Sequence, residues 1–259
     1  MEPLFFGSST APLYGVYHPP TTNLYRSEGV LLCYPAGQEY MRIHRAYRQL
    51  ASMLSKSGFH VLRFDYSGTG DSHGDMEDAN FDDWAKDTAT AADELKSIAN
   101  IDRLFIVGSR LGATVASELA SIVPIGKLVL WEPFAESSMW TNELLSLIDK
   151  TPTQSNYRDG LGGLHVNGFH FTEKFCESLS NKALEDYSWL DANIQVLIVS
   201  ANESIEHKQL TNTLQNRGVN STFKQVQCLD DWNQLDKLGG LFLPQDTLHT
   251  ITDWLETKN

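Results

Sequence analysis

The sequence has few cysteines and none of the spacings that hold a metal. Cys33, Cys176 and Cys228 are odd in number, far apart and without CxxC spacing. Neither a disulfide framework nor a zinc site is therefore indicated. We expect three reduced thiols and no metal or other cofactor, because no phosphate-binding or zinc-binding motif occurs in the right context either.

Basic residues and long apolar runs are also scarce. The chain has 20 Lys and Arg against 33 Asp and Glu, a net charge of -13, and such a charge repels nucleic-acid phosphates and anionic membranes. No stretch approaches the roughly 20 apolar residues that a membrane helix needs. The start, MEPLFFGSST, lacks the basic and apolar regions of a signal peptide. We expect no nucleic-acid partner, no membrane span and a cytoplasmic location.

Short apolar runs alternate with longer amphipathic segments along most of the chain. The strand-like runs are GVLLCYP (29–35), HVLRFDY (60–66), RLFIVGS (103–109), KLVLWEP (127–133) and QVLIVSA (195–201). Helical patterns cover 41–56, 81–98, 111–122 and 205–216. Nearly continuous apolar strands are typical of parallel sheets covered on both faces. The pattern predicts an α/β fold with a mainly parallel central sheet and helices on both faces.

Two segments depart from this alternation. LFFGSS (4–9) and LYGVYHP (13–19) predict an antiparallel hairpin at the sheet edge. The stretch from about 134 to 193 lacks a clean rhythm and contains four glycines, so we expect a small cap-like insertion there, over the carboxyl ends of the strands. No repeat or linker divides the chain, and we expect a single domain over 1–259.

A strand-turn-helix segment reads Gly108-Ser109-Arg110-Leu111-Gly112. Two glycines that flank a central residue between a buried strand and a helix form a nucleophile elbow, in which close packing excludes side chains at the glycines. The central residue of such an elbow is ordinarily serine, and here it is Arg110. A guanidinium stays protonated and has five donors but no lone pair. The usual acyl-enzyme reaction is therefore not expected at Arg110.

With RFDYSGTGDSHGD (63–75), VGSRLGAT (107–114) and LVLWEP (128–133), the chain resembles the α/β-hydrolase superfamily over nearly its whole length. Within it, the chain is most similar to serine-aminopeptidase-like and exosortase-associated hydrolases. The resemblance implies the α/β-hydrolase fold and a hydrolase-like protein. In the exosortase-associated group an arginine commonly stands inside the elbow, and similar proteins are often partners of biosynthetic or export systems.

The other two triad positions also look altered. The acid expected after the strand at 195–201 falls near Ser204, where only Glu203 offers a carboxylate. The histidine expected before the last helix falls near Gly239 and Gly240, where no imidazole stands. Because strand and helix patterns fix these positions independently, we predict a degenerate Ser-His-Asp triad.

An arginine in the elbow would strengthen a site for anions. The central residue lies at a helix N-terminus, where free N–H groups and the helix dipole favour negative charge. Together with N–H groups of Leu111 and of the loop with Ala36, Gly37 and Gln38, Arg110 could bind a carboxylate, a phosphate or an enolate.

Simpler interpretations stand beside this one. Arg110 could pair with Glu132 or Glu39, and arginine is well suited to partly buried ion pairs. Ser109 is the best serine for catalysis, although its place beside the nucleophile position favours packing. His44 could act as a base, although a helix surface is the simpler position for it.

Two classes of function follow. In the first, an α/β-hydrolase-fold protein with a degenerate triad binds a small acyl or anionic ligand, or serves as a scaffold, without serine-esterase activity. In the second, an active hydrolase or acyltransferase uses a non-standard mechanism on an ester or thioester of a biosynthetic pathway. A homodimer or a protein partner from such a pathway stays open under both, because fold alone does not choose a function.

Overall fold

The computed structural model describes residues 1–22, 26–150, 152–180, 182–184, 193–226, 232 and 244–257. Its main sheet contains β1 (Glu2–Gly7), β2 (Pro12–His18), β3 (Glu28–Cys33), β4 (His60–Phe64), β5 (Arg103–Ser109), β6 (Lys127–Trp131), β10 (Gln195–Ser200) and β11 (Asn220–Gln225). The strand order is β1-β2-β4-β3-β5-β6-β10-β11. β2 is antiparallel to β1 and β4, and the other neighbours are parallel. The mainly parallel sheet and its antiparallel edge hairpin are thereby confirmed.

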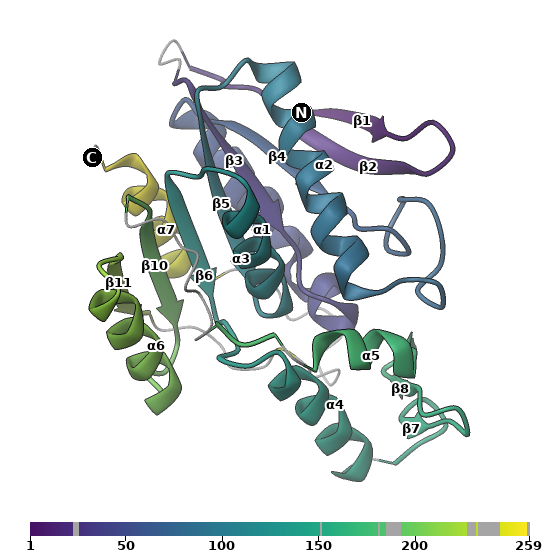
Figure 1. Cartoon of the computed structure of the whole chain (residues 1–259). Coiled ribbons are helices and arrows are strands. Elements are labelled where there is room, and N and C mark those ends of the chain that lie inside the picture. Colours follow the sequence, from purple (N-terminus) through teal and green to yellow (C-terminus); the bar gives the residue numbers. More distant parts are fainter. Residues whose placement is uncertain are drawn as a thin grey trace.

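Helices cover both faces of this sheet (Figure 1). They are α1 (Gly37–Lys56), α2 (Phe81–Ala99), α3 (Leu111–Ile122), α6 (Ile205–Asn216) and α7 (Gln245–Glu256). α2 packs against α3, and α1 packs against α7 behind the sheet. After their first residues, Arg103 and Lys127, β5 and β6 are almost entirely apolar, because both of their faces are buried. Among the described helices, none has the length and apolar character needed to cross a bilayer.

Between β6 and β10 the chain forms the insertion, which lies beyond the carboxyl ends of the strands (Figure 1). It contains α4 (Ser138–Lys150), β7 (Tyr157–Arg158), β8 (Leu164–Val166), β9 (Phe169–Phe171) and α5 (Glu173–Leu179). The three short strands form their own antiparallel sheet in the order β7-β8-β9. α4 packs against β8 and α5, and α5 also contacts α2.

One boundary differs from the sequence-based expectation. α1 begins at Gly37, earlier than the residue 41 expected from the apolar pattern. Gly37 has a φ of +57°, a conformation that glycine adopts without strain, so the chain turns directly from β3 into the helix. Gly37 and Gln38 of the expected oxyanion loop therefore lie in the first helical turn, after Ala36 at the N-cap position.

Candidate functional site

The candidate site lies where the connections of the sheet change direction. β3 and β5 are neighbours, but the chain runs from β3 through α1 to β4 on one side and from β5 through α3 to β6 on the other. Open α/β sheets hold ligands at such a switch point, outside the carboxyl ends of the strands. Residues 36–39 follow β3 and Arg110 follows β5, so the two segments meet there.

The backbone around Arg110 forms a nucleophile elbow. A Cβ on Gly108 would lie 2.3 Å from the carbonyl oxygen of Gly112, and a Cβ on Gly112 would lie 2.4 Å from those of Cys33 and Tyr34. Both positions therefore require glycine. Arg110 itself has φ 52° and ψ -123°, a strained conformation for a residue with a side chain. Functional sites concentrate such strain, and the elbow keeps it with an arginine at its central position.

The guanidinium of Arg110 is surrounded by carboxylates and aromatic rings. Its Nε and Nη2 donate to Glu39 Oε1 at 3.1 and 2.9 Å, and Nη2 also donates to Glu143 Oε2. The ring centroid of Phe134 lies 4.1 Å from the guanidinium carbon, and that of Trp232 lies 5.6 Å away. Burial disfavours the charged guanidinium, but the two carboxylates outweigh it and the pKa of Arg110 is raised. Arg110 is therefore a buried cation held by two anions.

Of the two alternative partners, Glu39 holds Arg110, whereas the carboxylate of Glu132 is bonded elsewhere. Glu132 accepts hydrogen bonds from Ser200 Oγ at 2.7 Å and from the Ala201 N–H at 2.6 Å. Its carboxylate thus closes the turn after β10 instead of reaching the elbow. Glu143, on α4 of the insertion, provides the second carboxylate.

Ser109 lies in the core rather than in the site. It is 0% exposed, and its Oγ accepts a hydrogen bond from the Tyr47 hydroxyl at 2.9 Å. Tyr47 is itself buried, and burial raises its pKa well above the ordinary value, so it is no base for Ser109. These contacts fit the packing interpretation.

His44 and Glu203 lie apart from the guanidinium. The ring of His44 stacks on Tyr34 with centroids 5.8 Å apart and lines a separate cavity of about 280 Å³ with Arg63 and Asp65. Burial and the nearby Arg63 lower the pKa of His44. Glu203 is exposed and forms an ion pair with Lys208 at 3.2 Å. The geometry therefore brings neither residue to Arg110.

The expected anion-binding residues lie at closely packed positions in the part of the chain that the structure describes. Leu111 is fully buried at the start of α3, and the first turn of α1 meets the insertion. A Cβ on Gly37 would lie 2.7 Å from Phe171 Cζ. The cavity shared by this turn and the insertion measures about 10 Å³, and its lining residues are Ala36, Gly37, Gln38, Glu39, Trp140, Leu144, Val166 and Phe171. A volume of that size holds about one water.

One residue of the site was not predicted from the sequence, and one predicted position falls on residues that the structure does not describe. Glu143 comes to the elbow from the insertion, and no local pattern marks it. The place expected for the histidine, near Gly239 and Gly240, lies outside the described residues.

Comparisons with known proteins agree with this architecture. The family model of serine aminopeptidases matches residues 40–156, which include the elbow. No curated protein gives a significant match. A putative hydrolase from Agrobacterium vitis is 16% identical, with a TM-score of 0.63, and the alignment covers 98% of this chain and 96% of that one.

Two esterases show the same likeness in structure. A thermostable carboxyl esterase from Bacillus coagulans, solved with glycerol, is 14% identical with a TM-score of 0.64, over 98% of this chain and 97% of that one. An esterase from Pyrococcus furiosus is 14% identical with a TM-score of 0.68, over 98% and 89%. At such identities the likeness establishes the fold. The chain therefore has the fold of the α/β-hydrolase superfamily.

Proposed function

We propose that this chain binds a small carboxylate or acyl anion at Arg110 and does not perform the serine-esterase reaction. The observation that carries the proposal is the place of Arg110. Its guanidinium stands where the elbow would present a nucleophile, and it already contacts two carboxylates. A site that holds two carboxylates has the donors to hold a third in place of one of them.

The argument against serine chemistry is chemical and geometric. A guanidinium has no lone pair for attack on a carbonyl carbon. The adjacent Ser109 is fully buried with its Oγ bonded to Tyr47, so a substrate carbonyl has no approach to it. Neither His44 nor Glu203 contacts Ser109 or Arg110 in a way that would make it a base.

The two carboxylates on Arg110 differ in how they are held. Glu39 is 1% exposed, within α1 of the main fold. The side chain of Glu143 is 45% exposed and belongs to α4 of the insertion. The ligand's carboxylate would replace that of Glu143, while Phe134 and Trp232 provide an apolar wall for the acyl part. Because Glu143 belongs to α4, its carboxylate has to leave the guanidinium before that of the ligand can take its place.

Octanoate is a suitable probe, because it combines a carboxylate with an acyl chain. We expect calorimetry to detect octanoate binding to the full chain, and to detect none with Arg110→Met/Glu39→Gln, which removes both charges of the buried pair. A fluorophosphonate should give no adduct by intact mass. Octanoate binding that survives in the double variant, or an adduct that disappears in Ser109→Ala, would contradict the proposal.

The likeness to esterases supports a second candidate, an active hydrolase or acyltransferase on an ester or thioester. In that case Arg110 would stabilise an oxyanion, and water or a second substrate would supply the nucleophile. Turnover of activated esters or thioesters without a protein adduct, abolished by the double variant, would favour this candidate over the binding protein.

A further inference from the structure

The insertion contains a hairpin that places two histidines side by side. β8 and β9 are joined by Asn167 and Gly168, whose φ values of 52° and 86° are those of a tight type I′ turn. His165 on β8 is directly opposite His170 on β9. Side chains at opposite positions extend from the same face of a hairpin. Their rings accordingly stack, with centroids 4.1 Å apart.

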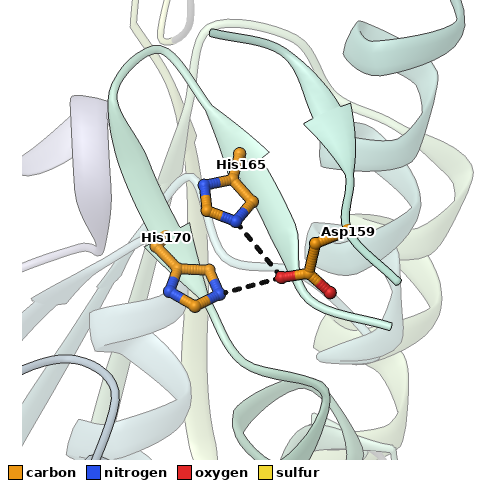
Figure 2. Close-up of side chains that lie close together, drawn as sticks. All are labelled: Asp159, His165 and His170. Atoms are coloured by element: carbon orange, nitrogen blue, oxygen red, sulfur yellow. Dashed lines mark hydrogen bonds and ion pairs between the residues drawn. The ribbon is translucent and has the colours of Figure 1, made fainter. Parts of the chain in front are cut away.

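A carboxylate faces both imidazoles. Figure 2 shows Asp159, just after β7, with one oxygen directed between the two rings. Its Oδ2 lies 3.2 Å from His165 Nε2 and 3.3 Å from His170 Nε2. Its other oxygen accepts hydrogen bonds from the Leu161 and Gly163 N–H groups at 2.8 and 2.9 Å. The turn therefore fixes the carboxylate and aims Oδ2 at the two histidines.

These three residues match a site for a transition metal. Their ligand atoms all lie within 4.8 Å of one another. A tetrahedral zinc with bonds of about 2.0–2.2 Å separates its ligands by about 3.3–3.6 Å, close to the oxygen–nitrogen distances above. We propose that Asp159, His165 and His170 bind one divalent transition metal ion such as Zn²⁺, with a fourth position left for water or another ligand.

A second carboxylate, on a side chain that is 77% exposed, lies near one of the imidazoles. Glu77 Oε1 lies 3.7 Å from Nδ1 of His170, the ring nitrogen opposite the one that faces Asp159. If the exposed Glu77 side chain moves close enough to accept a hydrogen bond from Nδ1, the Nε2 lone pair is left for a metal. With the proton at Nδ1, a neutral His170 would direct a lone pair at the oxygen of Asp159. A cation between the two atoms relieves that repulsion.

Glycine keeps the space beside the ligands open. A Cβ on Gly163 would lie 2.6 Å from Asp159 Oδ2 and 2.8 Å from His170 Nε2. The ion would join β7, β8 and β9, because each ligand comes from a different strand or from the turn after it. The sequence-based expectation of no metal rested on cysteine spacing and on known motifs, and this cluster belongs to neither.

Titration of the chelator-stripped full chain with Zn²⁺, in competition with a chromophoric chelator, tests the proposal. We expect about one equivalent to bind, and Co²⁺ in its place to give the visible absorption of a low-symmetry site. Asp159→Asn and His165→Gln should each abolish tight binding. His249→Gln, which changes an exposed histidine of α7, should bind as the unchanged chain does. Glu77→Gln should weaken binding by about 10- to 100-fold.

A further variant separates metal binding from folding of the insertion. Gly163→Ala keeps all three ligands and should weaken Zn²⁺ binding at least about tenfold, as expected for a disturbed ligand shell, with an unchanged circular dichroism spectrum. If the unchanged chain binds no Zn²⁺, or if Asp159→Asn and Gly163→Ala bind it as tightly as the unchanged chain, the proposal is wrong.

Discussion

The elbow and the hairpin of the insertion differ in how deeply their charged side chains are buried and in how these side chains are paired. At the elbow, Arg110 is 8% exposed and Glu39 is 1% exposed, and each satisfies the charge of the other. In the hairpin, the side chains of Asp159, His165 and His170 are 22–28% exposed and direct three ligand atoms at one point. The central residue of the elbow is thus held in a buried ion pair, whereas a more exposed set of possible ligands lies on the insertion.

The two regions are in physical contact. Helix α4 supplies Glu143 to the elbow and also carries Trp140, whose ring packs edge-on against Phe171 of β9 at 4.8 Å. Phe171 in turn fills the space beside Gly37. A displacement of α4 by a ligand at Arg110 would therefore change the packing of Trp140 against Phe171 in the hairpin.

The largest change in the free energy of unfolding is expected when the buried Arg110–Glu39 pair is broken. Arg110→Ala leaves the Glu39 carboxylate buried without its guanidinium, and removal of one partner of a buried pair costs about 3–5 kcal/mol. Urea unfolding should show a loss of this size in the free energy of unfolding. Arg110→Met/Glu39→Gln removes both charges and should recover most of it. A loss below about 1 kcal/mol, the range of exposed ion pairs, would mean that the elbow is as open as the hairpin.

Binding of Zn²⁺ at the hairpin should change the free energy of unfolding by somewhat less than Arg110→Ala does. A ligand that binds only the folded chain stabilises it by about 2.7 kcal/mol at 100 times its dissociation constant. The melting temperature of the chelator-stripped chain should therefore rise by about 5–10 °C on addition of Zn²⁺, at about 2–4 °C per kcal/mol. Asp159→Asn should show no such rise, and His249→Gln should show all of it. An equal rise in Asp159→Asn would place the metal elsewhere.

A third experiment contrasts glycines of the two regions. Gly112→Ala places a Cβ 2.4 Å from two backbone oxygens, whereas a Cβ on Gly160 of the insertion meets nothing within 4 Å. Overpacking of this kind costs about 1–3 kcal/mol, and Gly160→Ala should change stability by less than about 0.5 kcal/mol. Chemical unfolding measures both. Equal effects would show that the backbone at the elbow can relax.

The sequence predicted the sheet and the elbow because both follow from local patterns. The apolar runs at 103–109 and 127–133 are buried on both faces, and they correspond to β5 and β6. The elbow is visible as two glycines at fixed spacing. The early start of α1 was missed, since the apolar pattern begins only after its first turn.

The partners of the charged residues could not be predicted in the same way. Glu143 reaches Arg110 across 33 positions through the packing of the insertion, which no periodicity encodes. The hairpin did have a local signal, because Asn167-Gly168 lies between Val166 and Phe169 with a histidine on each side. Asp159 approaches these histidines only through the pairing of β7 with β8.

The smallest effect on stability should come from Glu143→Gln, and it tests whether the elbow can open. The side chain of Glu143 is 45% exposed, so its pair with Arg110 should contribute at most about 1 kcal/mol to stability. The same change removes the carboxylate that competes with a ligand for Nη2 of Arg110. Octanoate should therefore bind several-fold more tightly to Glu143→Gln than to the unchanged chain in calorimetry.

The control is Asp149→Asn, which makes the same change of charge at an exposed position of the same helix and should leave the affinity for octanoate unchanged. If both variants bind octanoate equally, the effect is one of net charge, and the Arg110 site stays closed to anions with Glu143 as a structural partner.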